Sequence, residues 1–133
     1  CCDLGTGTTF SGVINSIRKE QYAIGFSALK GADKLTGDVQ RLEKIKRRNW
    51  HISFNYHFGG FAKRSKQLEE FIKEFGSKTN VPLDPIYTGK MAYGILDLAE
   101  NGYFKKGSTV IMVHTGGLQG IAGYNKRYGA NIQ

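Results

Sequence analysis

The chain has 133 residues, a length that suits one domain. Hydrophobic residues make up 40% of it and charged residues 23%, a globular composition that argues against intrinsic disorder. No apolar run approaches the roughly 20 residues that a membrane-spanning helix needs. The two cysteines, Cys1 and Cys2, are adjacent and cannot join distant segments, so we expect a reducing, cytoplasmic setting.

The net charge of +8 raises the question of nucleic-acid binding. Basic residues are densest over 41–48, and Trp50 follows them, a combination that can bind a phosphate backbone. Leu42 and Ile45 lie three residues apart within this segment, so the cations can equally be the solvated face at the end of an amphipathic helix. Because a charge run alone is weak evidence, we favour the solvated face over nucleic-acid binding.

Strands and helices alternate in the first half of the chain. Residues 1–4 can form only the last part of a strand. A helix from Thr9 is predicted by apolar residues that recur at i, i+3, i+4 and i+7, namely Phe10, Val13, Ile14 and Ile17. The apolar run 22–29 has the length of a strand, and apolar residues three or four apart over 35–42 predict a second helix. Alternating side chains over 51–56 predict a third strand.

The second half continues this alternation. An apolar face over 68–75 predicts a helix that ends at Gly76, and another over 91–98 predicts a helix that ends at Asn101 and Gly102. The uninterrupted apolar run 109–113 predicts a strand buried on both faces. The sequence therefore predicts one α/β domain with a mostly parallel sheet and flanking helices.

The loop after the first strand has the composition of an anion site. It consists of Gly5, Thr6, Gly7, Thr8 and Thr9, so its backbone N–H groups, its hydroxyls and a helix N-terminus can converge on a phosphate. The nucleotide motifs do not fit: Val13 and Ile14 stand where a Walker motif has Lys-Ser, and Phe10 stands where a dinucleotide fingerprint has glycine. We expect a phosphate monoester on a small cofactor; the alternative is a plain turn with a threonine N-cap.

Two further motifs lie in the C-terminal part, LDPIYTGK at 83–90 and HTGG at 114–117. With GTGTTFSG at 5–12, they resemble, in the same order, the C-terminal part of the pyridoxal-phosphate enzymes grouped as D-cysteine desulfhydrase and 1-aminocyclopropane-1-carboxylate (ACC) deaminase. The resemblance spans essentially the whole chain but well under half of the family's length. It implies that residues 1–133 are the cofactor-cradling portion of the large domain of a tryptophan-synthase-β-like fold, without the enzyme's N-terminal half.

The resemblance also implies roles for individual residues. Tyr87 matches an active-site tyrosine near the substrate, and Thr115 matches a position close to the pyridine nitrogen of pyridoxal 5′-phosphate. Gly116, with Gly117, leaves the backbone beside the ring unobstructed, and Thr88 also counts among the cofactor-binding positions. The phosphate cradle corresponds to Gly5, Thr6, Gly7, Thr8 and Thr9, where Thr8 replaces a glycine of the family.

Two catalytic groups of the family have no counterpart in these motifs. A second active-site tyrosine aligns with Phe61, so its phenol is absent or its role moves to Tyr56. The lysine that binds the cofactor belongs to the N-terminal half, and no lysine of this chain is nominated for it.

Threonine at both 88 and 115 bears on the substrate. ACC deaminases look to carry Glu at the position of Thr88 and Leu at the position of Thr115. A carboxylate beside the pyridine nitrogen makes the ring a stronger electron sink than a hydroxyl does. The threonine pair therefore favours α,β-elimination of D-cysteine to pyruvate, hydrogen sulfide and ammonia. The alternatives are ACC ring opening to 2-oxobutyrate and ammonia, and a phosphate-ligand-binding fragment without catalysis.

The predicted partners are a small amino-acid substrate, the N-terminal half of the same enzyme and a second subunit in a homodimer, with neither nucleic acid nor membrane. No spacing of His, Cys, Asp and Glu indicates a metal site. Each residue also has a plainer interpretation: Tyr87 is a half-buried aromatic at a helix start, Thr88 an N-cap, Lys90 a lysine that reaches solvent, and His114 a core histidine with one hydrogen bond.

Overall fold

A computed structural model of the chain describes residues 1–44, 46 and 48–133. Three parallel strands, β1 (Cys2–Leu4), β2 (Ala23–Ser27) and β3 (Trp50–Ser53), form a sheet in the order β1-β2-β3. Helices α1 (Thr8–Ser16) and α2 (Leu35–Leu42) connect the parallel strands, one after β1 and one after β2. The predicted parallel α/β sheet is confirmed.

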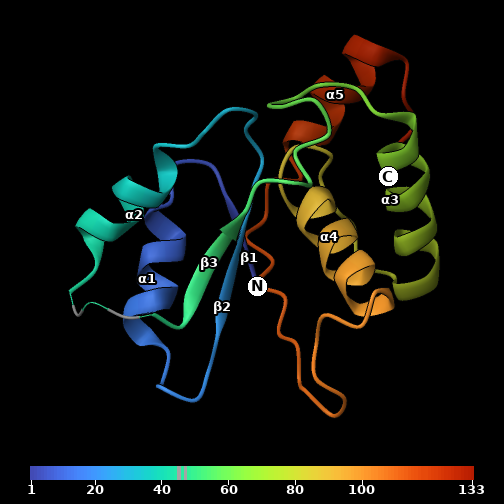
Figure 1. Ribbon diagram of the computed structural model, residues 1–133. Helices are drawn as coiled ribbons and strands as arrows, with labels where there is room; N and C mark the ends of the chain where they lie inside the picture. Colours follow the sequence, from blue (N-terminus) through green and yellow to red (C-terminus); the bar gives the residue numbers. More distant parts are fainter. Residues whose placement is uncertain (45, 47) are drawn as a thin grey trace.

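Helices cover both faces of the sheet (Figure 1). Helix α1, backed by α2, lies on one face, and α4 (Thr88–Glu100), backed by α3 (Lys66–Thr79), lies on the other. Each face has its own core: Phe10 and Ile14 of α1 are buried with Leu4, whereas Met91 and Ile95 of α4 are buried with Phe26. Alternate side chains of a strand point to opposite faces, so β2 contributes to both cores, whereas Cys2 and Leu4 of β1 belong to the core on the α1 face.

One predicted helix end is wrong, and another falls on residues that the structure does not describe. Helix α3 does not stop at Gly76 but continues to Thr79, because Asn80 adopts the left-handed conformation (φ 57°) and its N–H donates to the Gly76 carbonyl. Asparagine is the usual alternative to glycine at this cap. Helix α2 ends at Leu42, and the predicted amphipathic continuation through Ile45 falls outside the described residues.

The predicted strand over 109–113 is wrong. The segment runs beside β1, but it makes only an isolated bridge between Val113 and Cys2. The Val113 N–H donates to the Cys1 carbonyl at 2.9 Å, and the Cys1 amino group donates to the Ile111 carbonyl at 2.8 Å. These contacts do not extend into a ladder, and Ile111 is 65% exposed rather than buried on both faces.

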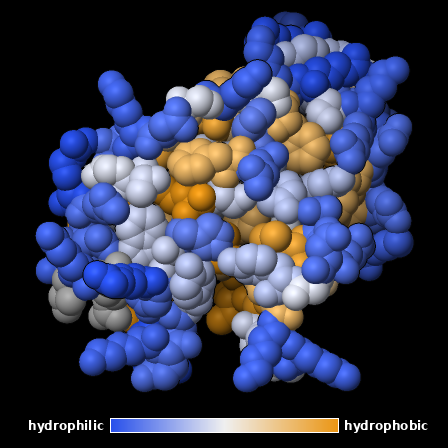
Figure 2. Space-filling view, in the orientation of Figure 1, coloured by the Kyte–Doolittle hydropathy of each residue, from blue (hydrophilic) through white to orange (hydrophobic). Residues whose placement is uncertain are grey.

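A fifth helix, α5 (Gly120–Tyr128), was not predicted, because its two glycines, Gly120 and Gly123, weaken the helical pattern. It packs on the core between α3 and α4 through Tyr124. Among the described residues, none of the helices is both long and apolar enough to cross a bilayer. Figure 2 shows apolar side chains exposed along the middle of one face of the molecule, between two polar flanks.

Candidate functional site

The Gly/Thr loop joins the C-terminal end of β1 to the first turn of α1. Gly7 is the N-cap of α1, and no side chain caps the N–H groups of its first turn. Only glycine suits this position, because φ is +86° and a Cβ would lie 2.7 Å from the Val39 side chain. The threonine N-cap that served as the plainer interpretation is therefore wrong. The uncapped amides beside the exposed side chains of Thr6, Thr8 and Thr9 can bind an anion.

A buried carboxylate, Asp84, shapes the turn that precedes α4. It is 1% exposed, and its Oδ1 accepts from the N–H groups of Ile86 and Tyr87 at 2.8 Å. Its Oδ2 accepts from the Thr88 N–H at 2.8 Å and from the Thr88 hydroxyl at 2.6 Å. Thr88 is fully buried, so its hydroxyl proton is committed to this turn. The four hydrogen bonds fix the backbone from which the Tyr87 side chain projects.

The Tyr87 ring lies against the Gly/Thr loop. A Cβ on Gly5 would be 3.3 Å from Cε1 of Tyr87 and 3.4 Å from its hydroxyl oxygen, so a glycine is needed for this approach. Burial, and then the negative charges of Asp84 and Asp3, raise the pKa of the Tyr87 phenol. At neutral pH the phenol is therefore protonated and can donate a hydrogen bond to a ligand.

The HTGG segment meets both of the other motifs. The Thr115 hydroxyl donates to Oδ1 of Asp3 at 2.8 Å, next to the start of the Gly/Thr loop. Gly117 lies on Asp84, since a Cβ there would be 3.0 Å from Oδ2. Between these contacts Gly116 has φ +95° and faces open space. Three segments far apart in the sequence thus converge at the C-terminal end of β1, where parallel α/β sheets bind ligands.

Comparison with known proteins bears on this convergence. No protein-family model matches the chain. A Pyrococcus furiosus protein named "Putative 1-aminocyclopropane-1-carboxylate deaminase" is 34% identical over 134 residues, covering 92% of this chain and 40% of its own length. The mitochondrial bifunctional D-cysteine desulfhydrase/1-aminocyclopropane-1-carboxylate deaminase of Arabidopsis thaliana is 38% identical over 63 residues, covering 47% of this chain and 16% of its own length.

A solved structure agrees with the sequence comparison. The crystal structure of an ACC deaminase homologue superposes with a TM-score of 0.74 at 25% identity, covering 95% of this chain and 41% of that one. The chain belongs to the D-cysteine desulfhydrase/ACC deaminase family. It spans about 40% of the length of the curated family members that match over most of it.

Phe61, which the sequence predicts to align with a second tyrosine of the family, lies beside Tyr87. The two ring centroids are 6.0 Å apart at an interplanar angle of 64°, and Phe61 is 54% exposed. The alternative that Tyr56 takes over the missing phenol is wrong. The Tyr56 hydroxyl donates to Asp97 at 2.7 Å, and Asp97 lies nine residues beyond Thr88, about 14 Å along α4.

Lys90 does not reach solvent, contrary to the sequence-based interpretation. It is 1% exposed, and its Nζ donates to the carbonyls of Gly60 at 2.8 Å and Ala28 at 3.2 Å. Burial lowers the pKa of Lys90 to about 8, against the opposing effect of the Asp84 charge. Lys90 thereby ties the loop that carries Phe61 to the end of β2.

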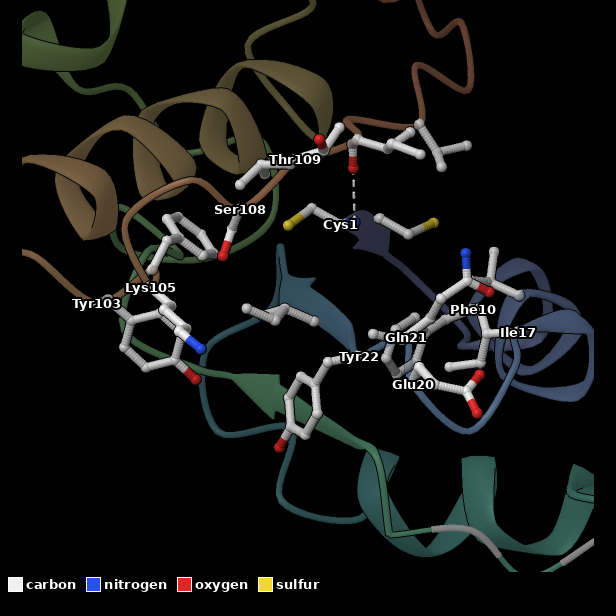
Figure 3. A pocket seen from close by; sticks show the side chains of 18 residues that line it. Cys1, Phe10, Ile17, Glu20, Gln21, Tyr22, Tyr103, Lys105, Ser108 and Thr109 are labelled. Atoms are coloured by element: carbon white, nitrogen blue, oxygen red, sulfur yellow. Dashed lines mark hydrogen bonds between the residues drawn. The ribbon is translucent and has the colours of Figure 1, made fainter.

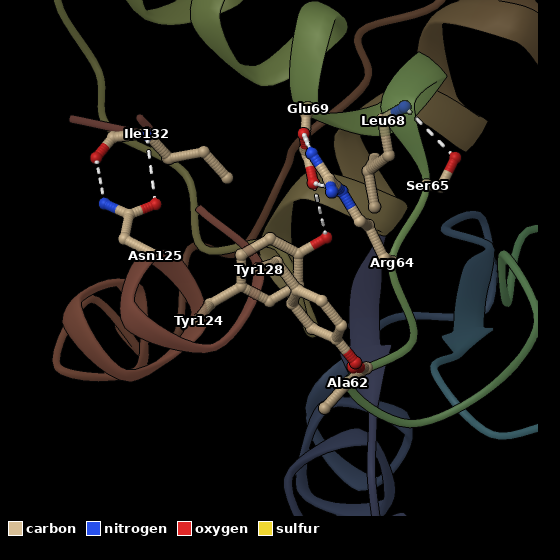
Figure 4. Close-up of polar contacts among 9 residues, drawn as sticks. All are labelled: Ala62, Arg64, Ser65, Leu68, Glu69, Tyr124, Asn125, Tyr128 and Ile132. Atoms are coloured by element: carbon tan, nitrogen blue, oxygen red, sulfur yellow. Dashed lines mark hydrogen bonds and ion pairs between the residues drawn. The ribbon is translucent and has the colours of Figure 1, made fainter. Parts of the chain in front are cut away.

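Helix α5 holds the other end of the Phe61 loop (Figure 4). The Tyr128 hydroxyl donates to the Ala62 carbonyl at 2.9 Å, while Glu69 receives Arg64 at 3.0 Å and the Tyr124 hydroxyl at 3.0 Å. Ala62 has φ 49°, a left-handed conformation that costs a non-glycine residue energy, so these anchors stabilise a strained loop.

The histidine prediction holds in part. His114 Nε2 lies 2.9 Å from the Pro82 carbonyl, but its Nδ1 also accepts from the Gly116 N–H at 3.1 Å, so it makes two hydrogen bonds instead of one. It is half-buried and orients the glycine backbone beside the site. Sequence reasoning assigned no role to Asp3 or Asp84. Two features could have identified them: an acidic residue within an apolar strand at Asp3, and an Asp-Pro pair before a helix at Asp84.

A separate cavity lies away from this site. Its volume is about 810 Å³, and it is lined by the beginnings of β1 and β2, one side of α1 and the segment 103–113 (Figure 3). These surfaces are mostly apolar and lie toward the N-terminal ends of the strands, whereas the family's three motifs meet at the C-terminal end of β1. In the described part of the chain, no cluster of three or more His, Cys, Asp or Glu could hold a metal ion.

Proposed function

We propose that this chain is the cofactor-cradling portion of a pyridoxal-phosphate-dependent lyase with D-cysteine desulfhydrase-like activity. The supporting observation is the convergence of the Gly/Thr loop, Tyr87 and Thr115 at the C-terminal end of β1. The residues fit the cofactor: uncapped amides and hydroxyls for its phosphate, and a glycine backbone at Gly116 for the face of its ring. When bound, pyridoxal phosphate supplies an electron sink for chemistry at the α-carbon of an amino acid.

The residues of the chain then have distinct tasks. Gly5, Thr6, Gly7, Thr8 and Thr9 bind the phosphate, with the positive end of the α1 dipole adding to the attraction. Thr115 would lie beside the ring nitrogen. Tyr87 holds its phenolic proton over the loop, and Asp84 and Thr88 fix its position rather than touching the ligand. We therefore give Thr88 an indirect role in cofactor binding.

The side chain of Thr88 also supports the proposed substrate. It is tied to Asp84 and presents no carboxylate to the ring, which favours a reaction with an easy leaving group. In that reaction D-cysteine loses its α-proton and its thiol, and water completes the conversion to pyruvate, hydrogen sulfide and ammonia. ACC deaminase activity is the second candidate, because the most extensively matching relatives carry that name.

The chain needs further polypeptide to complete this activity. Lys90 is buried with its ammonium on two carbonyls, so the lysine that binds the cofactor would come from the part of the family's fold that this chain does not span. The apolar cavity beside β1 is where we place that part against this one. We also propose a homodimer in the cytoplasm.

Binding of pyridoxal 5′-phosphate to the chain tests the cradle. Gly7→Ala should weaken binding at least tenfold, because its Cβ meets Val39 and disfavours the loop conformation. Gly107→Ala is the matched control: its φ is also +86°, but nothing lies within 4 Å of the added Cβ, and it stands outside the site. Equal binding by both variants, or none by the wild type in Trp50 fluorescence titrations, would refute the cradle.

Turnover distinguishes the catalytic candidates. The complete enzyme should release hydrogen sulfide and pyruvate from D-cysteine faster than it releases 2-oxobutyrate from ACC. The reverse order would identify an ACC deaminase. Cofactor binding without turnover of either substrate would indicate a binding module.

A further inference from the structure

The hydrogen bond between Asp3 and Thr115 joins the second residue of β1 to the HTGG segment, 112 residues away. Asp3 is half-buried, and Thr115 is exposed beside the open space at Gly116. The donor–acceptor distance of 2.8 Å is in the ordinary range for a hydroxyl on a carboxylate. The pair therefore lies at the wall of the site rather than within the core.

The chemistry of the two groups fixes the direction of this bond. An ionised carboxylate can only accept hydrogen bonds, so the single hydroxyl proton of Thr115 points to Asp3. Toward the open space, the hydroxyl oxygen of Thr115 can then only accept a hydrogen bond. A ligand atom that contacts Thr115 must therefore be a hydrogen-bond donor.

We propose that Asp3 is a positioning residue that makes Thr115 a hydrogen-bond acceptor, so that a cofactor ring nitrogen at Thr115 is bound in its protonated form. This inference rests on the proposed function, which places that nitrogen at Thr115. Through one intervening hydroxyl, Asp3 supplies the negative charge that neither threonine carries. Because this charge acts through a hydroxyl, it strengthens the electron sink less than a carboxylate in direct contact with the nitrogen would, which agrees with a reaction that has an easy leaving group.

The surroundings of Asp3 include several charged or titratable groups. Burial raises the pKa of Asp3, the Thr115 hydrogen bond opposes that rise, Asp84 adds to it and His114 opposes it. The negative charge of Asp3 also contributes to raising the pKa of the Tyr87 phenol and that of the Cys2 thiol. Below the pKa of Asp3 its carboxyl is neutral, and the constraint on Thr115 is lost.

Pyridoxine 5′-phosphate labelled with ¹⁵N in its ring tests the inference without turnover, since it lacks the aldehyde and forms no covalent bond. The ¹⁵N chemical shift reports whether the bound ring nitrogen is protonated. In the wild type we expect its deprotonation midpoint to lie about one pH unit or more above that in Asp3→Asn, the size of effect expected for a nearby opposite charge. Asp33→Asn, which removes an exposed carboxylate elsewhere, should leave the midpoint unchanged.

Thr115→Val provides the second test, because valine keeps the shape but cannot link Asp3 to the ring. It should lower the midpoint to that of Asp3→Asn, and the double variant should fall no further. Identical midpoints in the wild type and both single variants, with binding retained, would overturn the inference alone. Failure of the wild type to bind the probe would overturn the proposed cofactor site and the inference together.

Discussion

At the scale of single residues, the site depends on buried polar groups more than on its visible hydroxyls. Asp84 is the central case, because one carboxylate accepts four hydrogen bonds within the turn that carries Tyr87. Hydrogen bonds to a buried charge contribute more than neutral ones, and a partner left unpaired in the interior costs its full desolvation. The position of Tyr87 therefore follows from a residue whose carboxylate is buried and fully committed to the turn.

Asp84→Asn should lower the free energy of unfolding by about 2–3 kcal/mol, the range for losing charge-assisted hydrogen bonds at a buried site. The amide retains one accepting oxygen and turns an NH₂ group toward a donor. Urea unfolding followed by circular dichroism measures the change, with Asp33→Asn as the exposed control. Equal stability of the two variants would show that the turn is held by its backbone alone.

At the scale of elements, the sequence predicts the helices and strands that have a regular apolar pattern. It does not predict the elements that depend on contacts with residues distant in the sequence. Helices α1, α2 and α4 followed from their spacing alone. Segment 109–113 has the composition of a buried strand, but it makes only one bridge, to Cys2, a remote contact that its local composition does not reveal. Helix α5 has weak propensity and is stabilised by Tyr124 packing under α3, which no local pattern reveals.

The same division holds for the site. The three motifs were recognisable because their residues are contiguous, and the structure brings them together. The contacts between them were not predictable, since Asp3 and Thr115 are joined only by the sheet. Lys90 was misjudged because a lysine on a helix usually reaches solvent, whereas here two carbonyls from separate loops receive its ammonium.

Buried Lys90 makes stability depend on pH. Its folded pKa of about 8 lies below the ordinary lysine value of 10.5, so between these values the unfolded chain binds a proton that the folded chain has lost. The contribution of Lys90 to stability therefore rises as pH increases from 8 toward 10. Cys2 acts in the opposite direction above pH 9, because burial raises the pKa of its thiol to about 11.

Comparison of variants separates these two effects. We expect the free energy of unfolding of the wild type to rise relative to that of Lys90→Met between pH 8 and pH 10, while the difference from Lys30→Met stays constant, since Lys30 is exposed. Urea unfolding at each pH provides the measurement. A difference between the wild type and Lys90→Met that does not change with pH would mean that the lysine keeps an ordinary pKa in the folded chain.

At the scale of the whole molecule, two opposing surface properties govern association. The cavity beside β1 leaves apolar side chains uncovered, among them Tyr22 (55% exposed), Tyr103 (50%) and Ile111 (65%). Apolar patches of this kind mark interaction surfaces. The net charge of +8 opposes contact between copies of the chain, and salt screens that repulsion, with a Debye length of about 3 Å at 1 M.

The balance predicts that the chain self-associates as salt increases, and that Ile111→Lys suppresses this by placing a charge in the cavity lining. Because Ile111 is largely exposed, the substitution should change the free energy of unfolding by only about 0.5 kcal/mol. Leu42→Lys adds the same charge at a side chain that is 49% exposed on α2, outside the cavity, and should leave association nearly intact.

Sedimentation velocity from 0.05 to 1 M salt gives the apparent mass of each variant. Equal suppression by both would mean that net charge alone governs association, whereas suppression by Ile111→Lys alone would locate the contact at the cavity where we place the rest of the enzyme.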